Sequence, residues 1–255
     1  MPFEPIQAVL VAMVLFVSSV IQGTVGFAAG LFGVPLLLLL ARLSLPETIA
    51  VLLVAATFQN IQGTWQLRRR IEYEKTWRPI LLRLVSLPMG AWVLLLAGAG
   101  SSEQVKQAVG VVLIATVAVM AAWRVKPRRQ LPAIWEYPAF TLSGFLAGFC
   151  GMGGPPMVLW VTSHRWASTR SRGFLFFVFL MGLLPQLVFH VLFFGTEMLW
   201  YYLLGLVCLP TILLGTFLGL RTGKKLPRPL LRKITLAVLV IVGISAIVSP
   251  LVIEG

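Results

Sequence analysis

Long uninterrupted apolar runs constrain this chain more than any other feature of its sequence. Each run holds about 20 residues, enough for a helix to cross a hydrocarbon core of about 30 Å. Hydrophobic residues make up 58% of the 255 residues and charged residues only 11%, which leaves too little polar surface for a soluble domain. The sequence therefore predicts an all-α integral membrane protein with six full spans, at residues 47–67, 78–98, 104–123, 172–194, 198–220 and 231–250.

Two further apolar stretches, residues 8–42 and 137–163, are interrupted by clusters of glycine and proline. The first carries "GFAAGLFGVP" at residues 26–35, and the second carries "GFCGMGGPP" at residues 148–156. Glycine and proline are the poorest helix formers, so we expect each stretch to break into two short helices. The roughly 14 residues from Ala8 to Ile21 would make a helix of only about 21 Å, too short to span.

Basic residues separate the loops into two groups. Loops rich in lysine and arginine are usually cytoplasmic, and loops without them usually face outward. This rule predicts a periplasmic side for both termini and for residues 99–103 and 195–199, in the bacterial inner membrane. It predicts a cytoplasmic side for residues 67–78, 124–136, 163–172 and 221–230. Each broken stretch would then enter and leave the membrane on the same side.

The chain contains an internal duplication. The two glycine and proline clusters lie about 121–122 residues apart, and the same offset relates "LLRLVSLP" at 81–88 to "LLGLVCLP" at 203–210, which agree at six of eight positions. We expect one membrane domain made of two repeats, residues 1–127 and 128–255, each with a re-entrant broken helix and three transmembrane helices. An odd number of crossings inverts the second repeat, as in many secondary transporters. A parallel repeat is the alternative if each broken stretch is one long tilted span.

These motifs resemble a known family. "GFCGMGGPPMVLW" is similar to the Gly-Gly-Pro signature of the sulfite exporter TauE/SafE family, also called the four-toluene-sulfonate uptake permease family. "GFAAGLFGVPLLLLL" is similar to its N-terminal glycine motif, and "RRRIEYEKTWRPILLRLVSLPMGAW" extends the resemblance over the whole chain. The resemblance implies an inner-membrane permease for small sulfur-containing or related organic anions. Ala28, Ala29 and Phe32 depart from the family, which often has more glycine there.

The two breaks are the first candidate for a binding site. A turn inside the bilayer exposes backbone N–H and C=O groups, which is tolerated only within protein or beside a polar cavity. Half-helices beginning near Phe27 and Pro155 would direct the positive ends of their dipoles at an anion. Packing of Gly26 and Gly30 against another helix is the alternative. The predicted substrate-binding residues at the breaks are Gln22, Gly23, Thr24, Gly26, Phe27, Gly30, Gly151, Met152, Gly153, Gly154, Pro155 and Pro156.

Polar side chains within the spans extend this candidate site. "TFQNIQGT" places Gln59 and Asn60 in the first full span, and Gln186 lies in the span at 172–194. We predict that these three amides bind substrate, with hydrogen bonding between helices as the alternative. Ser143 is a further candidate donor, with hydrogen bonding between helices as an equal alternative. His190 could carry a proton, but a packed or interfacial position is the favoured interpretation. Arg83 is expected to extend to the cytoplasmic interface, with attraction of an anion as the alternative.

The sequence indicates a transporter and no enzyme. It contains no nucleophile–base pair, Walker-type phosphate loop or metal-ligand cluster, so we expect neither cofactor nor bound metal, and two free thiols at Cys150 and Cys208. The predicted function is secondary transport of a small anion such as sulfite, thiosulfate, an organosulfonate or an organic acid. Its partners would be this anion, the lipid bilayer and a coupling ion, H⁺ or Na⁺, with no nucleic acid and an undefined oligomeric state. An anion channel and a non-transporting scaffold are the alternatives.

Overall fold

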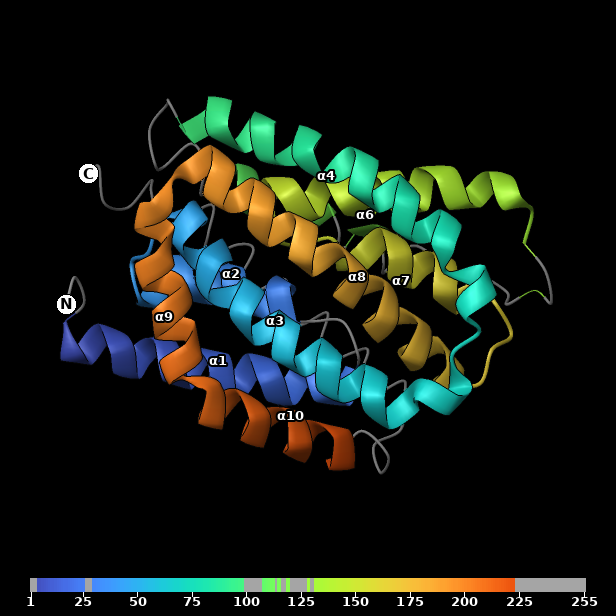
Figure 1. The fold of residues 1–255 in the computed structure, drawn as a ribbon, viewed down its shortest axis with the longest axis horizontal. Coiled ribbons are helices and arrows are strands. Elements are labelled where there is room, and N and C mark those ends of the chain that lie inside the picture. The colour runs from blue at the N-terminus through green and yellow to red at the C-terminus, as the bar shows by residue number, and fades with distance from the viewer. Residues whose placement is uncertain are drawn as a thin grey trace.

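The computed structural model describes residues 4–25, 29–98, 107–112, 114–115, 118–119, 128 and 131–222. Secondary structure in these residues is helical apart from one isolated bridge between Arg128 and His164. The helices run mostly along the long axis of the molecule (Figure 1). The α-helices are α1 (Pro5–Val25), α2 (Ala29–Leu40), α3 (Leu45–Leu67), α4 (Trp77–Gly98), α6 (Glu136–Cys150), α7 (Gly154–Thr162), α8 (Ser168–Phe194), α9 (Leu199–Val207) and α10 (Leu209–Thr222). The 3₁₀ turns are η1 (Arg68–Arg70), η2 (Tyr73–Lys75), η3 (Ala133–Trp135) and η4 (Thr196–Met198).

Several described helices match the predicted spans. By length and composition, Pro5–Thr24, Tyr73–Ala97 and Ser168–Phe194 are apolar enough to cross a membrane. Helices α4 and α8 correspond to the predicted spans at 78–98 and 172–194, and helix α3 covers the predicted span at 47–67 but is not among these three. The prediction at 231–250 and half of the residues of the prediction at 104–123 lie outside the described residues. Many large apolar side chains are exposed, among them Val85, Leu192 and Val207 at 71–75%, as suits a surface in contact with lipid.

The predicted span at 198–220 consists of two helices instead of one continuous helix. Helices α9 and α10 are bent by 54° at a break beside Cys208. Pro210 has no N–H to donate to the carbonyl four residues earlier, which weakens the helix at this point. The equivalent Pro88 nevertheless lies inside the unbroken helix α4.

The first glycine and proline segment forms a hairpin of unequal arms. Gln7 Nε2 donates to the carbonyl of Ala41 at 2.8 Å, so the two ends of the segment lie together. The predicted short arm ending at Ile21 was wrong, because α1 has 21 residues and is about 31 Å long. The helix continues through Thr24, whose Oγ1 donates to the carbonyl of Val20 at 2.7 Å.

The second segment also folds back on itself, through α6 and α7. The Arg128 N–H donates to the carbonyl of Ser163 at 2.9 Å, and the Arg165 N–H donates to the carbonyl of Arg128 at 3.0 Å, so its ends lie together too. Helix α6 ends at Gly151, whose φ of 71° is the left-handed conformation that favours glycine. The segment therefore has the same two-helix plan as the first.

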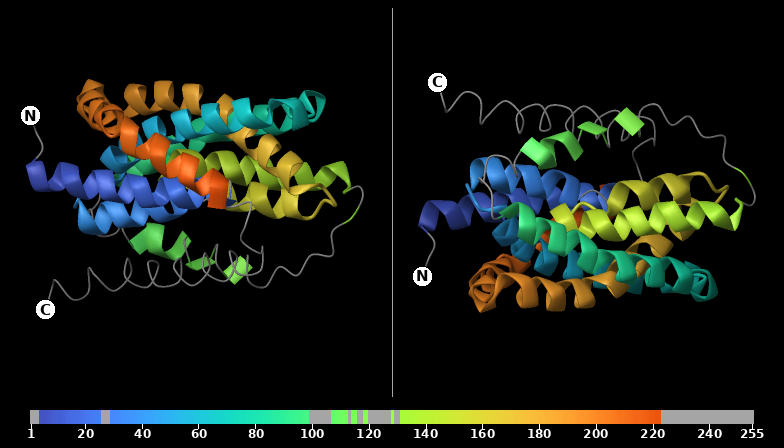
Figure 2. Two further views of the ribbon diagram at one scale, coloured as in Figure 1. Left: turned by 90° about the horizontal axis from the view of Figure 1, so that it is seen from below. Right: turned by 90° about the horizontal axis from the view of Figure 1, so that it is seen from above.

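The two hairpins begin at opposite ends of the molecule. Helix α1 starts at the end where the N-terminus lies, whereas α6 starts at the other end (Figures 1 and 2). At that second end the predicted cytoplasmic loops meet, because Arg170 Nη2 and Glu72 Oε2 form an ion pair of 2.8 Å.

Close helix packing joins the two halves of the chain. The most extensive helix contacts are α4 with α6 and α1 with α10, followed by α3 with α8. Glycines permit this proximity: a Cβ on Gly148 would lie 2.1 Å from the carbonyl oxygen of Leu87, and one on Gly219 would lie 2.2 Å from that of Val20. The pairs α4 with α6 and α1 with α10 each join the first helix of one hairpin to a helix from the other half of the chain.

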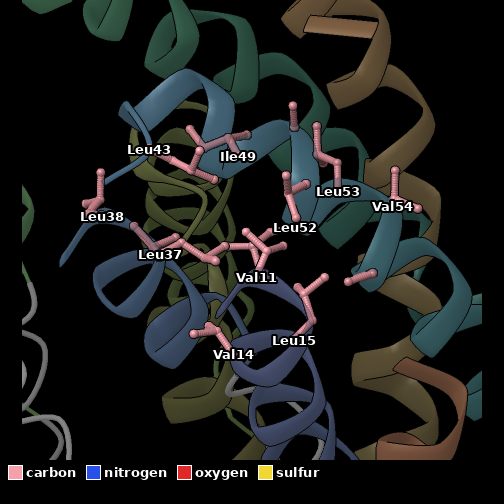
Figure 3. Close-up of a cluster of buried hydrophobic side chains, with 14 of the residues drawn as sticks. Val11, Val14, Leu15, Leu37, Leu38, Leu43, Ile49, Leu52, Leu53 and Val54 are labelled. Carbon is pink, nitrogen blue, oxygen red and sulfur yellow. The ribbon is translucent and has the colours of Figure 1, made fainter. Parts of the chain in front are cut away.

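An apolar core holds the first hairpin in place. The side chains labelled in Figure 3 come from α1, α2, α3 and the turn between α2 and α3, and they lie between these helices. Burial of such side chains contributes about 1.5–3 kcal/mol each in an aqueous reference, and in lipid the packing itself supplies the stabilisation. The labelled residues in this core are Val11, Val14, Leu15, Leu37, Leu38, Leu43, Ile49, Leu52, Leu53 and Val54.

Candidate functional site at the meeting of the two helix breaks

A cavity of about 70 Å³ lies where the two hairpins meet. It is lined by residues of both breaks and of the helices that surround them, α3, α4 and α8. The lining is apolar except for one cation and a few amides and backbone groups. The described residues that line it are Gln22, Ala29, Gly30, Leu31, Ile49, Leu52, Leu53, Ala56, Asn60, Arg83, Ala147, Gly151, Met152, Gly153, Gly154, Phe179, Leu183 and Gln186.

The two breaks touch each other at glycines. A Cβ on Gly30 would lie 2.5 Å from the carbonyl oxygen of Gly151, closer than any side chain allows. Each break is also held internally by a polar side chain from its first helix. Gln22 Oε1 accepts from the Ala29 N–H at 2.9 Å, and Ser143 Oγ donates to the carbonyl of Gly153. Packing and cavity lining are thus served by the same glycines.

The backbone at the breaks offers an anion fewer donors than the sequence suggested. The N–H of Ala29 is already bonded to Gln22, and Pro155 and Pro156 remove two N–H groups from the first turn of α7. One helix also ends where the next begins, so the negative end of α1 or α6 lies beside the positive end of α2 or α7. The opposed dipoles largely offset each other.

Arg83 supplies the charge of the cavity. The expectation that it extends to the membrane interface was wrong, because it is 2% exposed and lines the cavity. Its Nη1 donates to the carbonyl of Val178 at 2.9 Å, and its guanidinium lies 5.1 Å from the Phe179 ring centroid. Its Nε has no hydrogen-bond partner in the part of the chain that the structure describes. Arg83 has no carboxylate partner among the described residues.

Sequence periodicity contains a signal for Arg83 that was missed. Arg83 shares a helix face with Leu87, Gly90 and Leu94, and this face of α4 packs against the protein. Val85, Met89 and other exposed residues occupy the opposite face. Residues 83, 87, 90 and 94 are spaced by three or four positions, which places Arg83 on the same inward face as these buried residues.

Two of the three predicted amides line the cavity. Asn60 Nδ2 donates to the carbonyl of Ala56 at 2.6 Å, and Gln186 Nε2 donates to that of Ala147 at 2.7 Å. Asn60 Oδ1 is buried without a partner among the described residues. Gln59 turns instead toward α1, where its Nε2 donates to Ser19 Oγ at 2.7 Å.

The predicted site residues fall into three groups. The first lines the cavity and comprises Gln22, Gly30, Asn60, Gly151, Met152, Gly153, Gly154 and Gln186. The second lies outside the lining and comprises Gly23, Thr24, Gln59, Pro155 and Pro156. Gly26 and Phe27 lie outside the described residues.

Other predicted polar residues have structural contacts. Thr24 Oγ1 lies 3.2 Å from Thr222 Oγ1, and the carbonyl of Gly23 accepts from Arg172 Nη2 at 2.6 Å. His190 Nδ1 lies 2.8 Å from the Tyr202 hydroxyl. Cys150 and Cys208 are buried free thiols, as expected.

These features define a multi-pass helical membrane protein with a buried, positively charged cavity between two broken helices. The profile of the Sulfite exporter TauE/SafE family matches residues 10–246. The chain belongs to this family, and the resemblance seen in its glycine motifs is confirmed. Membership identifies it as a member of a transporter family, with a small anion as substrate and lipid as surroundings. No significant match was found among curated proteins or solved structures.

Proposed function

We propose that the protein is a secondary transporter of a small sulfur-containing anion and that the central cavity is its substrate site. The observation that carries this proposal is Arg83, a buried cation in the cavity with no carboxylate partner among the described residues. Burial of an ion costs several kcal/mol unless an opposite charge and hydrogen bonds compensate. A bound anion would supply both.

The groups around Arg83 suit an oxyanion. Its Nε, which has no partner among the described residues, can donate to one oxygen of the ligand, and a guanidinium binds several oxygens in a fixed geometry. Backbone at Gly30 and Gly154 lies in the same cavity without a side chain in the way. The site residues we propose are Arg83, Asn60, Gln186, Gln22 and the glycines of both breaks.

Alternating access through two inverted repeats would explain the arrangement. The hairpins start at opposite ends, and the packing of α4 on α6 corresponds to that of α10 on α1 under an exchange of the repeats 1–127 and 128–255. In transporters of this plan, one repeat rocks against the other around a site near the midplane. The 54° bend between α9 and α10, absent from the equivalent α4, supports two repeats in different conformations.

The distribution of basic residues favours one orientation of the protein in the membrane. The end that holds η1, η2 and the start of α8 is rich in arginine and lysine, so it would face the cytoplasm of a bacterial inner membrane. Both termini would then be periplasmic. Reporter fusions at residues 72 and 197 test this orientation, and a cytoplasmic signal at residue 197 would contradict it.

Counterflow into proteoliposomes tests the function. Sulfite loaded on the inside is expected to stimulate entry of labelled sulfite, because a carrier returns faster when occupied. An anion channel would conduct without such stimulation, and a non-transporting scaffold would give no flux. Imposed H⁺ or Na⁺ gradients in the same vesicles identify the coupling ion.

A further inference from the structure

We propose that the cavity selects an oxyanion with one negative charge and one hydroxyl group, of which singly protonated sulfite is the simplest example. Fully deprotonated dianions would be excluded. This inference rests on the proposed function and specifies the form of the substrate that the same site binds. It depends on the charge, the unpaired acceptor and the volume of the cavity.

The charge of the cavity matches one negative charge. Arg83 is the ionisable residue among the described lining residues. The other buried titratable groups on the surrounding helices are engaged elsewhere: Arg172 with Gly23, Cys150 with Leu146, and His190 with Tyr202. Glu47 accepts from Tyr201. Glu136 lies in the first turn of α6, and Arg170 lies in the first turn of α8.

The helix ends do not add a second positive charge. Each break places the negative end of one helix beside the positive end of the next, and the Ala29 N–H is capped by Gln22. A monoanion therefore neutralises the cavity. A dianion would leave one uncompensated charge in the interior of the protein, which is strongly unfavourable.

Asn60 lines the cavity, and its side chain holds a buried acceptor without a partner among the described residues, which calls for a donor on the ligand. The carbonyl of Ala56 can only accept, so the amide of Asn60 must turn its nitrogen toward it and present Oδ1 elsewhere. This Oδ1 is buried and has no partner among the described residues. A deprotonated oxyanion could only repel it, whereas a protonated one can donate its O–H to Asn60 and accept from Arg83 Nε.

The volume restricts the ligand to a few heavy atoms. About 70 Å³ is roughly half of the ~150 Å³ cavity that accommodates benzene in another protein. A small pyramidal or tetrahedral oxyanion fits this space, and an aromatic sulfonate does not.

Transport of this form would move a proton without a protein carboxylate. HSO₃⁻ would enter the cavity with its proton, cross, and dissociate to SO₃²⁻ and H⁺ on the far side when the pH there is higher. Charge and atoms balance in this step, because the proton remains on the ligand throughout the crossing. The substrate itself would then carry the proton, and no protein side chain would have to bind and release it.

Binding to the purified full-length protein tests the proposal. Sulfite should be titrated by calorimetry under anaerobic conditions across a pH series around neutrality. The apparent Kd for total sulfite is expected to weaken about tenfold per pH unit above the second pKa of sulfite, while the Kd for HSO₃⁻ stays constant. Methanesulfonate, a permanent monoanion without a hydroxyl, should bind more weakly with no such pH dependence. Sulfate, a dianion, should not bind.

A substitution at Asn60 tests the contribution of the ligand's hydroxyl group separately from that of its charge. Asn60→Leu keeps the size of the side chain and removes the acceptor, so the preference for sulfite over methanesulfonate should fall from about tenfold to about one. Retained binding of methanesulfonate shows that the variant is folded. An unchanged preference would overturn the role of the hydroxyl.

The outcomes distinguish this inference from the proposed function. If sulfite affinity is independent of pH, or if sulfate binds as well as sulfite, the monoanion proposal is wrong, although transport through the Arg83 site can still hold. If no anion binds at any pH and no flux occurs in proteoliposomes, both proposals are wrong.

Discussion

Gly30 and Gly151 bring the two helix breaks into direct contact, with a space of 2.5 Å between the position of a Gly30 Cβ and the carbonyl oxygen of Gly151. One residue belongs to the first hairpin and the other to the second, although they are far apart in sequence. Backbone cannot yield as the tip of a side chain can, so a side chain at Gly30 would separate the hairpins.

Gly30→Ala is therefore expected to lower stability by about 1–3 kcal/mol, the usual cost of overpacking. Gly33→Ala is the matched control on the same helix. The atoms nearest to its Cβ would be Cδ2, Cδ1 and Cγ of Leu52, at 2.5, 3.2 and 3.5 Å, which belong to a side chain that can move, so its cost should be smaller. Melting temperatures of the two purified variants check this order. Equal melting temperatures would show that the breaks are not rigidly apposed.

Gly153 and Gly154 should respond differently to substitution. A Cβ on Gly153 would lie 2.4 Å from the carbonyl oxygen of Ser143, so Gly153→Ala should destabilise the fold and reduce binding as a consequence. Gly154 lines the cavity, and Gly154→Leu should fill it and abolish binding of sulfite. A folded Gly154→Leu protein that binds sulfite normally would contradict the site.

Glu47 is expected to be structural. Its Oε1 accepts from the Tyr201 hydroxyl at 2.6 Å and its Oε2 accepts from the Ser44 N–H at 2.8 Å, which joins α9 to the start of α3. Glu47→Gln should cost about 1 kcal/mol through the weaker cap and leave the Kd for sulfite unchanged. Loss of binding in this variant, with the melting temperature intact, would assign Glu47 a role in substrate access.

His164, in the loop after α7, should make the fold sensitive to acid. Burial lowers its pKa below the ordinary value, and the nearby Arg170 and Lys75 lower it further against the opposing effect of the Trp160 carbonyl. The unfolded chain then takes up the proton more readily than the folded one, so stability falls as the pH drops from about 6.5 toward the lowered pKa. His164→Gln should reduce the loss of melting temperature between pH 7 and pH 5. An identical loss would place the acid sensitivity elsewhere.

Local pattern predicted the long helices well and their bends poorly. Apolar runs near residues 78–98 and 172–194 correspond to α4 and α8 because length and hydropathy decide these helices. "LLRLVSLP" and "LLGLVCLP" are nearly identical, yet the first lies within α4 and the second bends by 54°. Packing explains this difference, because α4 packs along the single helix α6, whereas α9 packs against α3 and α10 packs against α1.

The candidate site was predicted in its location but not in its charge. Glycine and proline clusters identified both breaks, and the cavity does lie between them. Asn60 and Gln59 are neighbours that face different partners, because consecutive helix residues differ by about 100° and rotation depends on packing. The expectation that Arg83 extends to the membrane interface relied on its distance from the helix end. Its side chain points into the protein because Arg83 lies on the buried face of α4.

Sulfite counterflow by Arg83→Gln proteoliposomes tests the central claim most directly. Exposed Arg221→Gln controls for the loss of one positive charge, and Arg83→Lys tests whether charge without the guanidinium fork is enough. We predict that Arg83→Gln reduces counterflow at least about 100-fold, as expected when a buried anion loses its counter-ion, while Arg221→Gln matches the wild type. Counterflow by Arg83→Gln at the wild-type rate would contradict the assignment of this cavity as the substrate site.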